Sequence, residues 1–458
     1  MPATATLSSA VRQIPKIPRA HWLLGNLRPF VSSPPHFLQQ AHSRYGPILE
    51  VGIPGRRLIS MVEPAYIQQV LVGHNRNYIK DPNTRALKIS LGEGLLTSDG
   101  DFWRKQRRIA QPAFHRHRLQ QLAQNMVKHT REMLQQWEHK PGFNLADEMM
   151  VLTSDIAATS LFGASVQNNL EIGRALLTAM RYHIQRFNNP FNLPHWMPTP
   201  ANRRYQRAMQ VLDRSVYGMI EQRRRAGQDG QHDLLAMLME ARDEETGEGM
   251  SDKQLRDECI TLFAAGHETS ANALCWLFYL LDQHPQVQQK VVAEIEAVLG
   301  QDEPTAGSIR GLEYTFRTIQ EGLRLYPPAW IIGREPLADD HIDGYHIPKG
   351  AFVTMCTYVV HRLPQLWESP EAFEPDRFLP EAVKARPKYA YFPFGGGPRL
   401  CIGNHFALME MQIVLAMVLQ RFRIRCLPGQ PAGMEPLITL RPKGGMQVKL
   451  EKRRLQEI

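Results

Sequence analysis

One cysteine in this sequence has neighbours that could make it chemically active. Cys401 lies in the stretch FGGGPRLCIG, from Phe394 to Gly403, directly before a strongly apolar helical pattern. The free N–H groups at a helix start stabilise a thiolate and lower the pKa of a cysteine. Arg399 adds a fixed cation that suits a carboxylate. From spacing alone, Cys401 is a buried structural cysteine, a metal or haem ligand, or a nucleophile with His405 as its base.

A second candidate group lies within a long helical pattern, in AAGHETS from Ala264 to Ser270. Glycine inside a helix costs about 0.5–1 kcal/mol relative to alanine, so Gly266 needs a reason. The Thr269 hydroxyl can donate to a carbonyl three or four residues earlier and bend the helix. Gly266 and Thr269 together would allow the helix to open locally beside a cofactor. The plain alternative is a helix-packing glycine beside a surface Glu-Thr pair.

Two further helical patterns carry paired polar side chains. Glu321 and Arg324 stand three residues apart, on one helical face. On an exposed helix such a pair is worth only a few tenths of a kcal/mol. Trp103 and Arg107, four residues apart, align an indole N–H and a guanidinium, which suit an anion. The alternative for this second pair is an amphipathic surface helix with an interface tryptophan.

The cysteine stretch carries a family resemblance. Phe394, Gly397, Arg399, Cys401 and Gly403 fit the pattern F-x-x-G-x-R-x-C-x-G, and here the sequence resembles the haem-binding loop of the cytochrome P-450 family. In that family the cysteine is the proximal thiolate on haem iron and favours O–O cleavage. The resemblance implies haem b with Cys401 as axial ligand, Phe394 near the sulfur and Arg399 against a haem propionate.

The long helical pattern also matches the family. Ala265, Gly266, Glu268 and Thr269 fit its A-G-x-(D/E)-T motif. The match implies that these residues deliver protons to iron-bound dioxygen. Thr269 would hold the bound oxygen species or a water, and Glu268 would be the acid of the relay.

The paired polar residues match as well. The family pairs E-x-x-R with an arginine of P-E-R-F in a buried triad, which implies that role for Glu321, Arg324 and Arg377; Asp376 replaces the more usual glutamate. Buried charges must be paired, so removal of any member should be severe. The W-x-x-x-R motif implies propionate contacts for Trp103 and Arg107, and Arg334 falls where the family often has another.

Cations gather around the W-x-x-x-R motif. A charge run is usually a solvated face, but the resemblance implies that this surface docks an acidic electron donor. The residues concerned are Arg104, Lys105, Arg108, His115, Arg116 and Arg118.

Family analogy also indicates a large apolar substrate cavity. Fatty acids, terpenoids and steroids all fit such a cavity, and each candidate side chain could equally belong to the core. The candidate lining residues are Phe187, Phe191, Phe263, Trp330, Ile331, Ile332 and Leu437.

Composition limits the remaining possibilities. The chain has 458 residues, 43% of them apolar, a net charge of +9 and five widely spaced cysteines without a CxxC pair. Its cations are scattered, so nucleic-acid binding is not indicated. No apolar run reaches the length of a membrane span. We therefore expect a cytoplasmic, monomeric protein without a membrane anchor, in a reducing compartment.

The elements that must position these residues are mainly helical, with small sheets near both ends. Helices are expected from about Ser251 to Gln283, with a capping box at SDKQ, then up to Gly300, and from about Glu313 to Leu325. Strands are expected in PILEVGI, RRLISMV, IDGYHI and AFVTMCTYVV, and a β-hairpin in PLITLRPKGGMQVKLE. The resemblance implies a triangular helical prism with haem between the long helix and the cysteine loop. We expect one haem domain over residues 1–458, with an irregular lead-in at 1–35 and no fused reductase domain.

The resemblance implies a haem-thiolate monooxygenase that inserts one oxygen atom of O2 into a hydrophobic substrate by hydroxylation or epoxidation. Electrons would come from NAD(P)H through a ferredoxin or flavodoxin-type donor with its reductase. The alternatives are a peroxygenase or isomerase on the same scaffold, and a non-catalytic haem protein.

Overall fold

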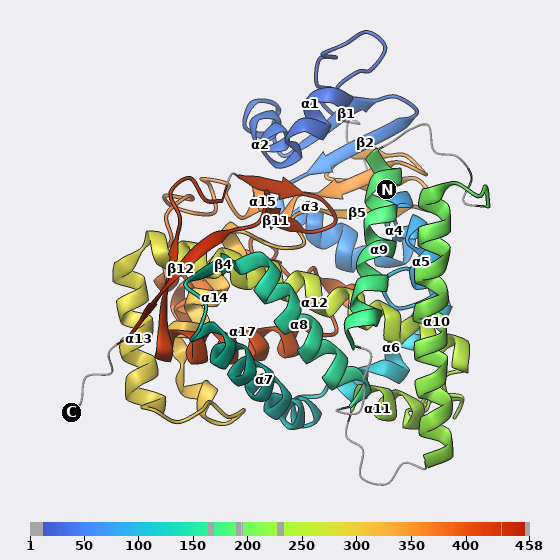
Figure 1. Ribbon diagram of the computed structural model, residues 1–458. Helices are drawn as coiled ribbons and strands as arrows, with labels where there is room; N and C mark the ends of the chain where they lie inside the picture. The colour runs from blue at the N-terminus through green and yellow to red at the C-terminus, as the bar shows by residue number, and fades with distance from the viewer. Residues whose placement is uncertain are drawn as a thin grey trace, which may run out of the picture. The chain divides into compact units, whose positions relative to one another are not determined.

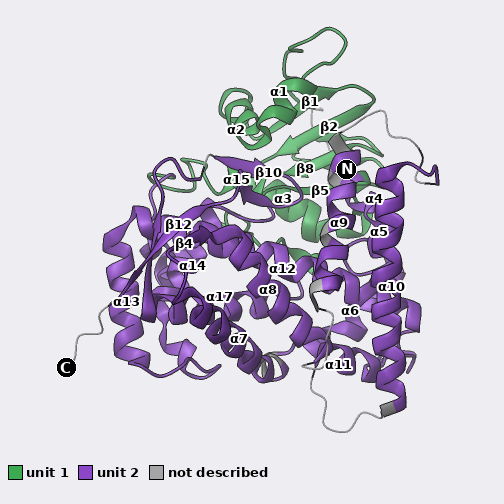
Figure 2. Cartoon of the chain, viewed as in Figure 1, with its two compact units in different colours: residues 1–82, 330–370, 386–400 green, residues 83–329, 371–385, 401–458 purple. Residues whose placement is uncertain are grey.

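The fold is described from a computed structural model of the chain. The chain divides into two compact units (Figure 2). Unit 1 comprises Met1–Pro82, Trp330–Pro370 and Arg386–Leu400, and unit 2 comprises Asn83–Ala329, Glu371–Ala385 and Cys401–Ile458. The structure describes residues 12–163, 169–188, 194, 196–226, 233–431 and 433–453.

A five-stranded sheet lies at the centre of unit 1, in the order β1-β2-β8-β5-β3. β2 and β8 run parallel, and the other neighbours are antiparallel. Two shorter strands, β6 and β7, pair antiparallel at IDGYHI, as predicted. The strands are β1 (Ile48–Ile53), β2 (Arg56–Met61), β3 (Tyr78–Lys80), β5 (Ile332–Pro336), β6 (Asp340–Ile342), β7 (Tyr345–Ile347) and β8 (Phe352–Met355).

Two predictions for unit 1 need correction. Residues 27–32 of the supposed irregular lead-in form a helix, and Pro34 and Pro35 begin the next one, where the missing N–H groups of proline do no harm. In AFVTMCTYVV only the first half is a strand, and the second half is helical. The helices and short turns are α1 (Leu27–Ser32), α2 (Pro34–Tyr45), α3 (Pro64–Gln68), η1 (Gln69–Gly73), η2 (Asn75–Asn77), α15 (Thr357–Val360) and η6 (Gly397–Arg399).

The long helix of unit 2, α12 (Asp252–Gln283), confirms the sequence prediction. The Ser251 side chain accepts from the N–H of Gln254, whose side chain in turn accepts from the N–H of Ser251. This capping box satisfies donors at the helix start. α12 packs along α8 (Leu145–Phe162), and α17 (Asn404–Arg421) packs against both α12 and α7 (Arg116–Trp137) (Figure 1).

The other helices of unit 2 surround these four, and two of them confirm predictions. α13 begins at Pro285 and ends before Gly300, and α14 ends before the Pro327-Pro328 pair. The remaining elements are α4 (Pro82–Ala86, at the unit boundary), α5 (Lys88–Leu91), α6 (Gly100–Ala110), η3 (Gln111–Phe114), α9 (Asn169–Asn188), α10 (Pro200–Ala226), α11 (Leu234–Glu240), α13 (Pro285–Leu299), η4 (Ser308–Gly311), α14 (Glu313–Leu325), η5 (Pro375–Phe378) and α16 (Pro380–Ala385).

The predicted C-terminal hairpin is wrong. β11 (Leu440–Pro442) pairs with β10 (Met434–Pro436), whereas β12 (Gln447–Lys452) pairs with β4 (Gly142–Asn144) and β9 (Phe422–Cys426). Gly444 and Gly445 do turn the chain, both with positive φ. A Cβ on Gly445 would lie only 2.4 Å from the Asn144 side chain, and that side chain accepts from the N–H of Met446. Contacts with a distant segment therefore direct β12 into another sheet.

Candidate functional site

α12 is buried along most of its length, except on one narrow face. Between Leu255 and Phe278 only Leu262, Ala265, Gly266 and Thr269 are not buried. Their spacing of three and four residues puts them on one side of the helix. We call these four residues the accessible stripe of α12. It contains three of the four motif residues predicted for this helix.

The accessible stripe is open because of its residue types. The Thr269 hydroxyl donates to the Ala265 carbonyl at 2.6 Å, the backward hydrogen bond expected from the sequence. A Cβ on Gly266 would meet only the Ala157 Cβ, at 3.9 Å. Close helix packing therefore does not require a glycine here, which removes the plain alternative for Gly266. Three of the four stripe residues, Ala265, Gly266 and Thr269, have small side chains, and Leu262 is partly exposed.

The fourth motif residue, Glu268, lies on a buried side of α12. One of its carboxylate oxygens accepts from the Thr439 hydroxyl at 2.6 Å. The Thr439 oxygen accepts in turn from the Asn272 amide at 3.0 Å, and all three side chains are buried. We call Asn272, Thr439 and Glu268 the acid network. Sequence reasoning missed Thr439 and Asn272, because no spacing signal links residues so far apart in the chain.

His267 stands next to the acid but turns into the core. Burial lowers the pKa of His267, although the Glu268 carboxylate acts in the opposite direction. Its ring stacks on Phe263 at 5.5 Å, and Phe263 is fully buried. Phe263, expected to line a substrate cavity, thus packs in the core, away from the accessible stripe.

Cys401 is an exposed thiol immediately before α17, with Gly403 as the helix N-cap. Burial lowers the pKa of Arg107, and the negative charge of a Cys401 thiolate acts against that shift. The guanidinium and the sulfur are therefore close enough to interact electrostatically. Trp103 lies one turn before Arg107 on α6 and is buried. Unit 2 thus combines a thiol at a helix start, a neighbouring cation and an indole.

The predicted triad residues lie together in unit 2. Arg324 binds Glu321 through two parallel hydrogen bonds of 2.7 and 2.8 Å, and neither side chain is exposed. Arg377 approaches the same carboxylate at 3.4 Å. The N–H of Glu374 donates to Glu321, and Arg324 donates to the Ala372 carbonyl at 2.9 Å. The ion pair thus ties α14 to the segment around η5.

Four predicted haem contacts belong to unit 1. Arg334 is buried on β5 and donates to the Gly333 carbonyl, while Phe394 and Arg399 are half-buried. Gly397 has φ +64°, and a Cβ there would lie 2.0 Å from the Leu71 carbonyl oxygen. This backbone conformation and the contact with Leu71 require glycine.

The basic surface around α6 is less positive than its sequence suggests. Lys105 forms an ion pair with Glu248, and Arg108 binds both Asp243 and Glu245 at 2.8 and 2.7 Å. Arg104 pairs with Asp101 on its own helix, while His115 and Arg118 are exposed. The side chain of Arg116 lies outside the described part. The chain's own carboxylates therefore neutralise three of the predicted cations.

The remaining cavity candidates are spread over both units. In unit 1 Trp330 is buried, and its carbonyl accepts from the N–H of Tyr358, while Ile331 and Ile332 are half-buried. In unit 2 Leu437 is half-buried, two residues before Thr439. Phe191 and the side chain of Phe187 lie outside the described residues. The structure thus gives partial exposure to three of the seven candidates.

Comparison with known proteins decides the family. A sequence model of the family Cytochrome P-450 matches residues 15–450. The chain belongs to the cytochrome P-450 family. As such it is a cytochrome P-450 monooxygenase, and the mainly helical fold with small sheets is the one expected.

Several relatives are similar over nearly their whole length. Cyclooctat-9-en-7-ol 5-monooxygenase of Streptomyces melanosporofaciens is 34% identical, over 93% of this chain and 94% of its own. Cyclooctatin synthase of the same organism is 34% identical, over 86% and 87%. Among solved structures, the cytochrome P450DA heme domain has a TM-score of 0.90 at 29% identity, over 98% and 99%. A retinoic-acid-bound cyanobacterial CYP120A1 has a TM-score of 0.86 at 28% identity, over 97% and 100%.

The cytochrome P-450 family holds haem through a cysteine thiolate, and the residues of unit 2 fit that group. No cluster of three or more His, Cys, Asp or Glu residues that could hold a metal ion occurs among the described residues. A porphyrin supplies its own nitrogen ligands, so a single accessible thiolate suffices. Cys401 is an accessible thiol of this kind, and the Arg107 cation lies close enough to interact with it. Within the same described ranges, no helix is long and apolar enough to cross a membrane.

A second buried acid lies near this site, and it makes stability depend on pH. Burial raises the pKa of Glu410 from 4.5 to about 8, although its hydrogen bond to Ser270 opposes the shift. The folded pKa exceeds the unfolded one, so the stabilisation from the neutral acid is complete below about pH 4.5. It is lost progressively as the pH rises to about 8.

We expect Glu410→Gln, which stays neutral, to gain stability over wild type as the pH rises from about 4.5 to 8. The difference should reach about 4–5 kcal/mol, because the folded pKa lies about 3.5 above the unfolded one and each pKa unit corresponds to about 1.4 kcal/mol. Urea unfolding of both proteins across this range measures it. If the free energies of unfolding of the two proteins changed in parallel across this pH range, ionisation of Glu410 would cost no stability and the prediction would be wrong.

Proposed function

We propose that this protein is a haem-thiolate monooxygenase that inserts one oxygen atom from O2 into a terpenoid-like hydrophobic substrate. The accessible stripe of α12, with the buried acid Glu268 beside Thr269, carries the proposal. An alcohol on an accessible helix face, with a buried acid as its neighbour in the chain, suits oxygen activation, which needs protons. Terpenoids are favoured over fatty acids and steroids by the two Streptomyces relatives and by the retinoic acid in the cyanobacterial structure.

The residues that would hold haem b have separate tasks. Cys401 would bind the iron as a thiolate, and Arg107 and Trp103 of the same unit would offer donors to the propionates. The haem supplies oxygen activation when bound. Burial of Arg107 favours this reading, because a partly desolvated guanidinium gains most from an anionic partner.

The protein's own contribution to proton transfer lies on α12. The Thr269 hydroxyl donates a hydrogen bond to the Ala265 carbonyl, so its oxygen remains an acceptor on the accessible stripe. The Glu268 carboxyl would hold the proton to be delivered. The Thr439 hydroxyl fixes the direction of that carboxyl, because a buried carboxylate keeps its hydrogen-bond donors. Thr439 is thus a positioning residue for Glu268.

Replacing Thr439 with Val should lower the fraction of electrons recovered in product, roughly tenfold. A hydrogen bond to a charged group is worth about 1.5–3 kcal/mol, and about 1.4 kcal/mol corresponds to a factor of ten. Thr439→Ser keeps the donor and should restore coupling. Product and peroxide per NADH, measured against pH, test this; equal coupling in all three proteins would rule out the positioning role.

The electron source is proposed to be a separate ferredoxin or flavodoxin-type donor, reduced by NAD(P)H through its reductase. The family match spans residues 15–450. We place the reaction in the cytoplasm, since all five cysteines are free thiols. NADPH oxidation by this chain alone should not yield product.

Substrate binding provides the test of the proposed function. We expect cyclic terpenoid alcohols and retinoids to shift the haem absorbance as they displace iron-bound water, and the added donor system to convert them. Saturated fatty acids and steroids serve as matched hydrophobic controls. If only those controls shifted the spectrum, the terpenoid assignment would be withdrawn. Product formed from peroxide but never from O2 and donor would favour the peroxygenase alternative.

A further inference from the structure

A tight turn in unit 1 exposes large apolar side chains to solvent. Trp22 is 79% exposed, Leu23 61% and Leu24 40%, and Val31 on the following helix α1 is 54% exposed. Large apolar side chains gathered in one short stretch mark a contact surface more often than single exposed ones do. We call these four residues, with Arg19 and Arg28, the apolar turn. The blue chain before α1 forms this loop in Figure 1.

The exposure does not result from a loose chain, because the turn is held from both sides. His21 and Gly25 exchange two backbone hydrogen bonds of 3.0 and 2.9 Å, and the His21 ring accepts from the N–H groups of Leu23 and Leu24. Gly25 has φ +55°, and a Cβ there would lie 2.2 Å from the Gly52 carbonyl oxygen. The turn is therefore pinned to β1, with its apolar side chains pointing outward.

Asn26 locks the base of the same turn. Its side chain accepts from the N–H of Ala20 at 3.1 Å, and its own N–H donates to the Gly52 carbonyl at 2.7 Å. Asn26 is itself buried. Because these hydrogen bonds fix the apolar turn in advance, its backbone loses little conformational freedom when it binds a partner.

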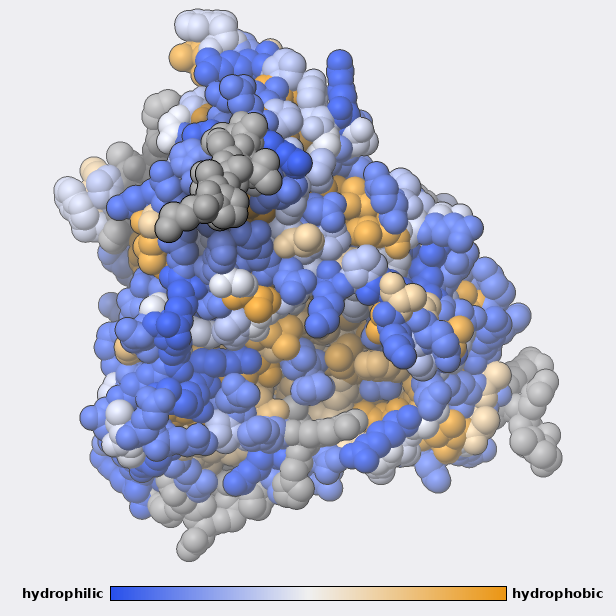
Figure 3. Space-filling model, turned by 180° about the vertical axis from the view of Figure 1, so that it is seen from behind, coloured by the Kyte–Doolittle hydropathy of each residue, from blue (hydrophilic) through white to orange (hydrophobic). Residues whose placement is uncertain are grey.

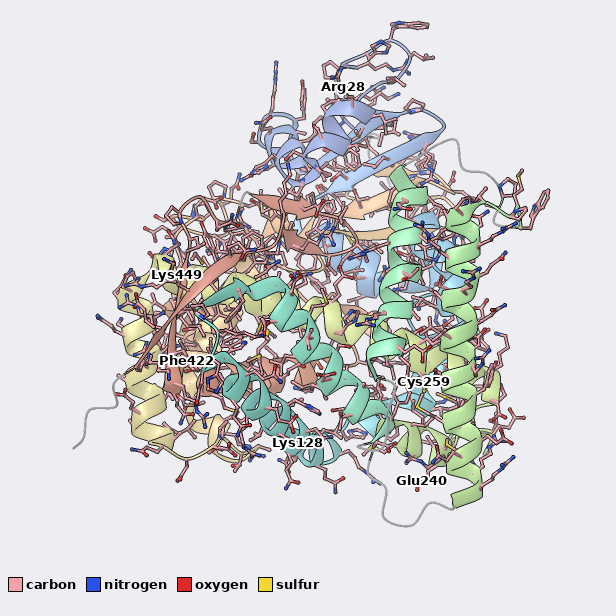
Figure 4. All side chains as sticks on the ribbon, viewed as in Figure 1. Arg28, Lys128, Glu240, Cys259, Phe422 and Lys449 are labelled. Carbon is pink, nitrogen blue, oxygen red and sulfur yellow. The ribbon has the colours of Figure 1, made fainter. Side chains whose placement is uncertain are left out.

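The charge around the turn selects the kind of partner. Residues 1–49 contain five Lys and Arg residues and no Asp or Glu, the first acidic residue being Glu50. Arg12 and Lys16 pair with Asp343 and Glu50. Within the described ranges, no ion pair is formed by Arg19 or Arg28, and both are exposed. Figure 4 shows Arg28 at this end of unit 1. The partner should therefore be anionic.

We propose that the apolar turn docks the protein on an anionic lipid bilayer surface. Apolar side chains that project from a turn can insert into the fluid interior of a bilayer without a preformed pocket. Tryptophan favours the boundary between the lipid headgroups and the acyl chains. Apolar insertion together with nearby cations is the combination that binds peripheral proteins to acidic lipids. This contact goes beyond the proposed reaction and does not depend on its substrate.

Vesicle sedimentation of the full, haem-loaded protein tests the proposal. We expect co-sedimentation with vesicles of phosphatidylglycerol and phosphatidylcholine at low salt, and far less with phosphatidylcholine alone. Trp22→Ser combined with Leu23→Ser should weaken binding to the mixed vesicles roughly tenfold or more. Arg19→Ala combined with Arg28→Ala should weaken it and reduce its salt dependence.

The matched control is Val151→Ser, which removes a side chain of comparable exposure (53%) from α8 in unit 2 and should leave binding unchanged. Hydrophobic residues also gather elsewhere on the molecule, as the orange patches within the mainly blue face of Figure 3 show. Unfolding midpoints and haem spectra verify that the variants fold. Equal sedimentation of wild type and Trp22→Ser/Leu23→Ser would overturn the proposal. Self-association that this variant abolishes, without vesicle binding by wild type, would assign the turn to a second copy instead.

Discussion

Arg324→Ala should be the most destabilising single substitution in this protein. It removes one partner of a fully buried ion pair and leaves the Glu321 carboxylate without its two hydrogen bonds from the guanidinium. Breaking a buried pair in this way costs about 3–5 kcal/mol, a large share of the stability of a typical protein. Arg324→Lys should be almost as destabilising, because an ammonium cannot form the two parallel hydrogen bonds.

Soluble yield and urea unfolding measure the effect. The matched control is Arg317→Ala on the same helix, since Arg317 pairs at 3.4 Å with the largely exposed Asp376. This ion pair is long and its acidic partner is largely exposed, so that variant should lose far less stability than Arg324→Ala. Equal stability of Arg324→Ala and Arg317→Ala would contradict the structural role assigned to the triad.

Cys401→Ser should abolish monooxygenase activity while leaving the fold intact. The thiol is exposed at the start of α17 and contributes little packing, so its unfolding midpoint should stay near that of wild type. The hydroxyl of serine does not supply the thiolate that favours O–O cleavage. Product formation with the donor system and haem content per protein are the measurements. Cys426→Ser, at a half-buried thiol on β9, is the control and should remain active. Persistent activity in Cys401→Ser would remove this residue from the catalytic centre.

Helix positions could be predicted from the sequence wherever local signals fix both ends. The capping box at Ser251, the proline at the start of α13 and the glycine after it act within one helical turn. The prolines of the lead-in were misread, because the same residue type begins a helix and interrupts one. The hairpin was wrong because strand partners lie far apart in the sequence: β12 pairs with β4, some three hundred residues earlier.

The candidate site likewise contains residues that the sequence could predict and residues that it could not. Motif matching indicated Ala265, Gly266 and Thr269, which share a helix face because residues three and four apart do so whatever surrounds them. Thr439 could not be found from the sequence, because its contact with Glu268 depends on how the chain after α17 returns to α12. The neutralised cations around Lys105 and Arg108 were missed because their carboxylates come from the segment between α11 and α12.

The absorbance spectrum of the reduced, carbon-monoxide-bound protein tests most directly whether Cys401 holds haem as a thiolate. We predict the strongly red-shifted Soret band of a haem-thiolate for wild type and its complete loss in Cys401→Ser, with haem still bound in part. A wild-type spectrum without that band, or a Cys401→Ser spectrum that retains it, would contradict the assignment of Cys401.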